Sequence, residues 1–593
     1  MELLKTRDAK NVYRQISNVI RNHIVTDRAK NEFCLDLTDN AGKIKQMHEK
    51  INAYNAIDDD TLDGIREILK DFELKWDKSF FVERIIATED DEIYEKLFPL
   101  RQHCEVVHLR AGDQQKPDEH GKQVIVVDYE PKIVEILPEY ILSDFVVNRN
   151  SVKKIFEIYE LLSKFNEFDD FKIESGIPRE ILDELFMFND KVEVDSGGLR
   201  QKRENIKKLK GIVYEEADGI NAEILKRVDE QAIKIDGKEL LEMNVALKDI
   251  SELAVFRKII GEVIKEHVKR ISENLGVNTS QLSGVFEDCY PSRVNEDEVK
   301  FLIDKINEGI LEEEYGFKVK LARKLAGKDN FLRDASDKIN ELDMVLAKIK
   351  FCRENNCTIP EMSGTDDAIY FKDAENLFIK SDSDRVVPVT YSLGGELEKR
   401  KVSILTGANS GGKTTLLKTI LQTQILAQSG MPVNARHCEF PVINEIYFLS
   451  KRTGTLNAGA FEHTLKGISK ILISDKKKLV LIDELEAITE PGAAARLICA
   501  ILEMLVEKGD FAVVVTHLSE EILEHIGEDV RVDGITATGL DEQLNLVVDR
   551  QPEFNTIGKS TPELIVEKLY RKSGASDMQK EIYKRILNKM GKG

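Results

Sequence analysis

The spacing of apolar residues divides the chain into a helical part and a part that alternates strands with helices. Up to about residue 360, apolar positions recur every three or four residues, as at Phe256, Ile260 and Ile264 and again from Leu321 to Ile349. Spacing of this kind predicts amphipathic helices with one buried stripe. We therefore expect a largely α-helical region up to about residue 360.

One segment of the helical part departs from this spacing. Val106–Val107 and Val124–Val127 are β-branched runs on either side of the polar stretch Ala111–Lys122. Runs rich in valine and isoleucine favour strands. We expect a pair of strands here, within a small mixed segment.

From about residue 365 to 570, short apolar runs alternate with helical stretches. Each run is bounded by glycine or polar residues, as is typical of buried parallel strands. The four runs are Val402–Thr406, Glu445–Leu449, Leu479–Ile482 and Phe511–Val515. Their alternation with helices predicts an α/β fold with a parallel sheet.

A phosphate-binding loop follows the first of these runs. The residues from Gly407 to Thr414 fit the pattern GxxxxGK[ST] and precede a helical stretch at Leu416–Leu426, which is the context that the motif requires. Its glycines let backbone N–H groups surround phosphates, and the helix start adds positive potential. We expect Lys413 to reach the β- and γ-phosphates and the Thr414 hydroxyl to ligate Mg²⁺. The predicted nucleotide-binding residues are Gly407, Ala408, Asn409, Ser410, Gly411, Gly412, Lys413, Thr414 and Thr415.

Two later strands end in polar residues. Asp483 and Glu484 follow Leu479–Ile482, and His517 comes shortly after Phe511–Val515. We expect Asp483 to bind Mg²⁺ through water and Glu484 to polarise the attacking water. Alone, this pair would be an ordinary solvated strand end, but a complete phosphate-binding loop favours the catalytic interpretation. His517 would lie level with the γ-phosphate and sense it; the alternative is a structural histidine.

Composition restricts the class of protein further. The chain has 593 residues, a net charge of −21 and seven scattered cysteines without a CxxC motif, which favours reduced thiols. No run of about 18 apolar residues exists and the charged start lacks an apolar signal core, so we expect a cytoplasmic protein without a membrane span. The acidic balance does not exclude local basic surfaces. The candidates are Arg200–Lys210 and Lys318–Lys324, and the alternative for each is a solvated helix face.

These motifs together resemble the MutS family of ATPases. The order and spacing of Gly407–Thr415, Asp483–Glu484 and Thr516–His517 match that family, as does the helix after the phosphate-binding loop. The most similar branch is the bacterial MutS paralogue that often carries a C-terminal Smr nuclease domain, together with archaeal MutS-like proteins. The resemblance covers about residues 365–570 and parts of 190–220 and 335–365.

The resemblance implies a homodimer whose composite sites use ATP and Mg²⁺. In the family, a signature segment of the partner subunit completes each site, and it aligns here with Ala458–Phe461. Gly459 stands where the family usually has a serine, so the backbone at Gly459 and Ala460 would have to serve at a helix start. Phe378 lies in the segment that usually contains His-Pro and is the candidate for stacking on adenine.

The resemblance also implies a domain order. We expect a mixed, mostly helical N-terminal region (1–150) and a helical core and lever region in which no clamp is recognised (151–360). A MutS-type P-loop ATPase domain (361–570) and a helical tail for dimerisation (571–593) follow. No segment resembles the mismatch-reading domain, and the sequence stops at Gly593 without an Smr-like tail. We therefore expect no nuclease activity.

Four functions stay open at this point. The first is an ATPase that clamps DNA, with branched, recombination or repair intermediates favoured over mismatched DNA. The second is a ribosome-associated ATPase of translation quality control, to which the same branch is linked. A structural ATPase of the ABC or SMC type is disfavoured, because it would show an LSGGQ-type signature and long heptad arms. The fourth, a nucleotide-binding module without turnover, is motivated by Gly459 and by the altered turn after Glu484.

Overall fold

The computed structural model divides the chain into two compact units. Unit 1 comprises Met1–Asp71, Glu160–Lys172 and Asp337–Gly593, and unit 2 comprises Phe72–Tyr159 and Ile173–Ser336. The structure describes residues 2–76, 80–109, 123–172, 177–230, 254–364, 367–379, 386–396, 398–408, 411–450, 458–488, 491–540, 546–558, 562–571 and 577–590. None of the helices within these ranges combines the length and the apolar composition that a membrane span requires.

The main sheet of unit 1 has six strands in the order β15-β12-β7-β11-β10-β9. All four runs expected from the sequence are confirmed as parallel strands. Two further strands, β12 and β15, extend the sheet beyond β7. The bounds are β7 (Val402–Gly407), β9 (Glu445–Leu449), β10 (Lys478–Asp483), β11 (Phe511–Val515), β12 (Val530–Ile535) and β15 (Glu553–Phe554).

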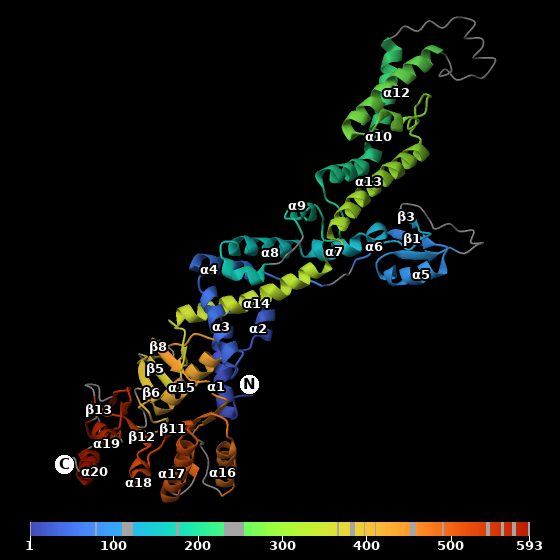
Figure 1. Cartoon of the computed structure of the whole chain (residues 1–593). Helices are drawn as coiled ribbons and strands as arrows, with labels where there is room; N and C mark the ends of the chain where they lie inside the picture. The colour runs from blue at the N-terminus through green and yellow to red at the C-terminus, as the bar shows by residue number, and fades with distance from the viewer. Residues whose placement is uncertain are drawn as a thin grey trace, which may run out of the picture. The chain divides into compact units, whose positions relative to one another are not determined.

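Alternate residues of the main sheet face two different layers of helix. Leu405 and Leu481 share a core with helix α15 (Lys413–Gln428). Ile404 and Val480 belong instead to a core with α16 (Ala458–Ile473) and α17 (Pro491–Glu507), and Figure 1 shows these two helices on the opposite side of the sheet from α15. Because both faces are covered, every residue of β7 is buried, as is typical of parallel sheets.

A second, smaller sheet packs against α15. Its strand order is β4-β8-β5-β6, and Phe371 and Phe440 from it lie in the same core as α15. The helix is therefore buried along nearly its whole length. The bounds are β4 (Glu361–Met362), β5 (Ala368–Ala374), β6 (Val389–Gly394) and β8 (His437–Phe440).

The first residues of the chain complete the edge of the main sheet. Leu4 forms a parallel bridge with Ile446 of β9, and the Thr6 hydroxyl donates a 2.8 Å hydrogen bond to the Phe448 carbonyl. Residues from both ends of the chain thus share one unit, so the units do not follow the expected ranges 1–150, 151–360, 361–570 and 571–593.

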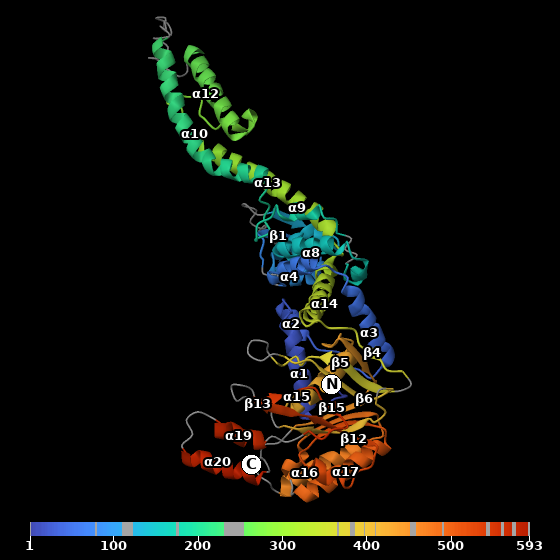
Figure 2. The same ribbon diagram turned by 90° about the vertical axis from the view of Figure 1, so that its left-hand side faces the viewer.

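The remaining elements of unit 1 are helical, apart from one short ribbon. The C-terminal helices α19 and α20 lie side by side (Figure 2). The bounds are α1 (Arg7–Arg21), α2 (Asp27–Glu32), α3 (Ala41–Tyr54), α4 (Asp59–Lys70), α14 (Asp329–Glu354, which begins in unit 2), α18 (Ser519–Leu523), β13 (Ala537–Leu540), β14 (Leu546–Val548), α19 (Pro562–Arg571) and α20 (Asp577–Lys589).

Unit 2 contains a three-stranded sheet that corrects the expected strand pair. Both expected strands are present, as β2 (Glu105–His108) and β3 (Gln123–Val126). They do not pair with each other, because β1 (Arg84–Thr88) lies between them and pairs with both in parallel. Parallel strands need a long connection, so neighbours in sequence were the wrong partners to expect. The stretch Ala111–Lys122 lies outside the described residues.

The rest of unit 2 is helical, as expected. The predicted apolar stripe that contains Ile260 lies on α12 and packs with α10 and α13 in one core. The bounds are α5 (Asp91–Leu97), α6 (Ile133–Ile136), α7 (Glu139–Val147), α8 (Arg149–Leu162, which ends in unit 1), α9 (Ile181–Leu185), α10 (Gly197–Glu230), α12 (Ala254–Leu275) and α13 (Glu296–Leu325).

Candidate active site

The phosphate-binding loop joins β7 to α15. Gly407 at the strand end has φ +123° and Gly412 before the helix has φ +97°, conformations that side chains with a Cβ rarely adopt. A Cβ on Gly407 would also lie 2.1 Å from the Ile535 carbonyl oxygen. The sequence therefore needs glycine at Gly407 for both conformation and space. Asn409 and Ser410 lie outside the described residues.

Lys413 opens α15 and folds back over the loop. Its Nζ donates to the carbonyl oxygens of Gly407 at 2.6 Å and of Ala408 at 2.9 Å. The residue is only 4% exposed, and a buried ammonium requires such acceptors. The loop thus holds a positive charge inside its own curve, where the motif would place phosphates.

Thr414 and Asp483 meet beside the loop. The Thr414 hydroxyl donates a 2.8 Å hydrogen bond to Oδ2 of Asp483, which is buried at the end of β10. A hydroxyl and a carboxylate are hard oxygen ligands of the kind that Mg²⁺ prefers. The described part of the chain contains no group of three or more His, Cys, Asp or Glu residues that would hold a metal by itself. The pair thus fits a Mg²⁺ ion that keeps water and phosphate oxygens as its other ligands.

Glu484 has an unusual backbone conformation. Its φ is +51°, which costs a non-glycine residue about 1–3 kcal/mol and is frequent at functional sites. The Glu484 N–H donates to the Val515 carbonyl at 3.0 Å, so β10 and β11 together hold the turn. Its carboxylate is mostly buried and lies 3.2 Å from Nε2 of His517.

The structure brings His517 to Glu484, as two adjacent parallel strands require. The His517 N–H also donates a 2.7 Å hydrogen bond to Oε1 of Glu486, a contact that the sequence analysis missed. Glu486 lies in the altered turn after Glu484, so that turn supplies an acceptor which fixes His517. Both interpretations of His517, the phosphate sensor and the structural histidine, are consistent with these bonds.

The other predicted site residues lie close to the loop or at a helix start. Gly411, Gly412 and Thr415 line a cavity of about 40 Å³. Phe378 packs against the hydrophobic core around α15 and is not among the residues lining that cavity, so its stacking on adenine stays a prediction. Gly459 and Ala460 lie in the first turn of α16, where backbone N–H groups have no partner within the helix.

One of the two candidate basic segments is largely engaged inside unit 2. Lys318 is buried and contacts Glu139 at 3.0 Å and Glu314 at 2.8 Å. Arg84 adds two further bonds to Glu139, at 2.7 and 3.0 Å. Although burial opposes ionisation of Glu139, Lys318 and Arg84 hold its pKa below the ordinary value. The expectation that Lys318 contributes to a basic surface is therefore wrong, because the fold uses its charge internally.

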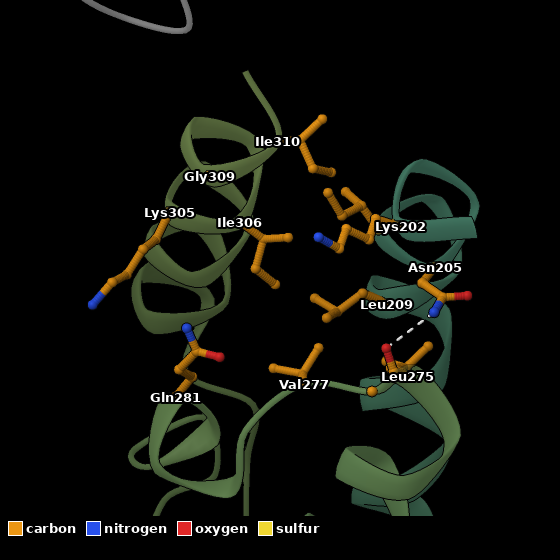
Figure 3. A pocket seen from close by; sticks show the side chains of 12 residues that line it. Lys202, Asn205, Leu209, Leu275, Val277, Gln281, Lys305, Ile306, Gly309 and Ile310 are labelled. Atoms are coloured by element: carbon orange, nitrogen blue, oxygen red, sulfur yellow. Dashed lines mark hydrogen bonds between the residues drawn. The ribbon is translucent and has the colours of Figure 1, made fainter. Parts of the chain in front are cut away.

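A larger cavity in unit 2 does not carry an active-site arrangement. It measures about 290 Å³ and lies between α10, α13 and the end of α12 (Figure 3). Three of its polar side chains are engaged: Asn205 donates to the Leu275 carbonyl at 3.0 Å, Gln281 accepts from the backbone of Asn278, and Lys202 pairs with Glu313. Lys305 is exposed and lies over the ring of Phe301. The other lining side chains are mostly apolar, and no hydroxyl or thiol nucleophile, carboxylate or histidine is among the lining residues.

The fold and the loop in unit 1 define a P-loop nucleotide-binding domain, and residues 403–553 match the family model of MutS domain V. The DNA-binding protein MutS2 of Pyrococcus furiosus is 33% identical over 556 residues, which cover 89% of this chain and 91% of that protein. The chain therefore belongs to the MutS family, within its MutS2 branch, and the resemblance seen in the sequence is confirmed.

Two bacterial relatives match a shorter part of the chain. The endonuclease MutS2 of Clostridium botulinum is 34% identical over 186 residues, and that of Exiguobacterium sibiricum is 36% identical over 193 residues. These alignments cover 30% and 32% of this chain but only 23% and 24% of the two relatives. Their nuclease function therefore cannot be transferred from the matched part alone.

Proposed function

We propose that this chain is an ATPase that works as a homodimer and couples ATP hydrolysis to the clamping of DNA. The observation that carries the proposal is the meeting of three sets of contacts at one edge of the main sheet: Lys413 with its loop carbonyls, Thr414 with Asp483, and Glu484 with His517. Phosphoryl transfer to water needs a cradle for phosphates, a metal site and a residue that orients the water. The three sets of contacts correspond to these three needs.

Each residue has a distinct part in the proposed reaction. The Lys413 ammonium exchanges its carbonyl partners for the β- and γ-phosphate oxygens of ATP. Thr414 and Asp483 would hold Mg²⁺, which would neutralise charge on the phosphates. Glu484 accepts a hydrogen bond from the attacking water and takes its proton. His517 keeps the Glu484 carboxylate in position and contacts the γ-phosphate.

We further propose that the partner subunit completes each site. The first turn of α16, which contains Gly459 and Ala460, would offer backbone N–H groups to the γ-phosphate of the partner's nucleotide. The C-terminal helices α19 and α20 are the candidate dimer contact, because Ile565, Met578 and Ile582 are exposed on them. Exposed apolar groups of this kind are frequent at interaction sites.

DNA is the proposed partner, since the relative that matches most of this chain is named a DNA-binding protein. Branched or recombination intermediates are favoured, with mismatched DNA as a further substrate class. The expected cytoplasmic location belongs to the same proposal.

Two measurements on the full chain test this function. Lys413→Ala should abolish ATP binding, and normal affinity in that variant would refute the phosphate-binding role of the loop. A Glu484→Gln variant should retain ATP and a closed dimer, so its ATP-dependent binding to branched DNA, linear duplex and ribosomes can be compared at a fixed salt concentration. Retention on DNA supports the clamp, whereas retention on ribosomes alone would move the protein to translation quality control.

The expected lack of nuclease activity stays a prediction, since the two bacterial relatives are named endonucleases. Incubation of the pure protein with supercoiled plasmid and Mg²⁺ tests it directly. Nicking that persists in the Lys413→Ala variant would show a nuclease centre separate from the nucleotide site.

A further inference from the structure

The cavity beside the phosphate-binding loop has a charged residue in its wall that no motif predicts. It is lined by Gly411, Gly412 and Thr415 on the side of the loop and by Arg550 among its other residues. Lys413 points toward the loop carbonyls, on the side of the β- and γ-phosphates. In a phosphate-binding loop, the glycines and the first helical turn surround the α- and β-phosphates, so this cavity marks the nucleoside side of the site.

The backbone around Arg550 is held in place, whereas its guanidinium has no partner in the part of the chain that the structure describes. Within the described residues it makes no hydrogen bond or ion pair, and it is only partly exposed. Its neighbour Gln551 forms two amide hydrogen bonds with the backbone of Thr390 in β6, of 2.9 Å from the Thr390 N–H and 2.6 Å to its carbonyl. The Asp549 N–H donates to Thr536 at 3.1 Å. The backbone on both sides of Arg550 is therefore fixed at the cavity wall.

The other walls of the cavity are apolar or already satisfied. Asn376 donates to Thr415 and Thr419 and accepts from the Phe378 N–H at 3.0 Å, so its amide is not available to a ligand. Ile379, Val387 and Val389 also line the cavity, and Val387 is 41% exposed. An exposed valine and a guanidinium that has no partner among the described residues both line this cavity, a combination suited to a flat apolar ring.

We infer that Arg550 positions the nucleotide by placing its guanidinium against the face of the base, with Val387 and Val389 as the apolar side of the same subsite. This inference rests on the proposed ATPase function. A cavity of about 40 Å³ is too small for a nucleoside, so the base lies at its mouth, where Val387 is exposed. A guanidinium stacks on aromatic rings through both its charge and its planar face. Arg550 therefore acts on the part of the ligand that ATP and ADP share.

The test measures equilibrium binding of ATP, ADP and GTP to the full chain with Mg²⁺. Arg550→Ala should weaken ATP and ADP binding to the same extent, by about two- to thirty-fold, the range of a cation–π contact. GTP should lose a similar factor, because the contact is to the face of the base. Arg550→Lys should recover only part of the loss, and Arg550→Ala should raise KM more than it lowers kcat. Arg436→Ala, an exposed arginine of unit 1 beside β8, is the matched control.

Several outcomes overturn the inference. If Arg550→Ala binds ATP with unchanged affinity while Lys413→Ala loses binding, the role of Arg550 is refuted. The ATPase proposal then stays intact, because the unmodified chain binds ATP normally. Full recovery by Arg550→Lys would show a phosphate contact in place of stacking. Absence of ATP binding by the unmodified chain would refute the proposed function itself.

Discussion

Replacing Glu484 with glutamine isolates the step in which the attacking water loses its proton. Glutamine has almost the same shape, so the hydrogen bond from the Glu484 N–H to Val515 and the contact at 3.2 Å with His517 can both persist. The positive φ of +51° costs about the same conformational energy with either side chain. The variant therefore removes a charge and a proton acceptor while the turn keeps its geometry.

The expected loss follows from the role of a general base. Proton transfer by a positioned side chain accelerates reactions by about 10²–10⁴-fold, which corresponds to about 3–5 kcal/mol of activation free energy. We expect kcat for ATP hydrolysis in Glu484→Gln to fall by that factor. ATP affinity should change by less than about threefold, because Lys413 and the loop still bind the phosphates.

Steady-state phosphate release and equilibrium ATP binding, measured on the same preparation, separate the two effects. Glu507→Gln is the matched control, since Glu507 is an exposed glutamate at the end of α17. Turnover in Glu484→Gln equal to that of the control would refute the role of Glu484 and require another residue to orient the water. Loss of ATP binding together with turnover would indicate a structural role for the carboxylate.

Three further predictions concern stability and pH. Asp343→Ala should lower the melting temperature of unit 1, since the buried Asp343 carboxylate accepts hydrogen bonds from the Val25 N–H and from the N–H and hydroxyl of Thr26. The free energy of unfolding should fall by about 3 kcal/mol, and an unchanged calorimetric transition would contradict this. Asp510→Ala should cost about 3–5 kcal/mol, because Lys478, fully buried at 2.8 Å from Asp510, loses its carboxylate partner. Adding Lys478→Met should restore part of the stability in the same calorimetric assay. Burial lowers the pKa of His48, so the unfolded state binds the proton more readily and stability falls as the pH drops below about 6.5. Between about pH 7.5 and 5, the melting temperature should therefore change less with pH in His48→Gln than in the unmodified chain.

The candidate site could be predicted because its chemistry depends on residues that are close in sequence or lie at the ends of adjacent strands. Gly407, Gly412 and Lys413 belong to one motif. Asp483 ends β10 and His517 follows the end of β11 by two residues, and the apolar pattern marks both strands clearly. Parallel strands bring such ends to one edge of the sheet, so the meeting of Thr414 with Asp483 follows from the topology.

The features that escaped prediction depend on partners far apart in the chain. The bridge between Leu4 and Ile446 joins residues that no local pattern relates. The pairing of β1 with both β2 and β3 depends on a five-residue strand whose signal is weak beside the helices that surround it. Arg550 follows a short ribbon strand and carries no motif, so only its place in the cavity wall identifies it.

The sequence also does not show which basic side chains are exposed and free to contact DNA. A run of lysines and arginines attracts phosphates only where its charges face solvent without acidic partners. Lys318 is buried among carboxylates, whereas in the segment Arg200–Lys210 the Lys207 and Lys208 side chains are exposed on α10 and have no ion-pair partner among the described residues. The structure thus removes Lys318 from the candidate DNA contacts and keeps exposed lysines such as Lys207 and Lys208 of α10. Substitutions of these two lysines should lower the salt dependence of DNA binding, whereas a change at Lys318 would disturb folding.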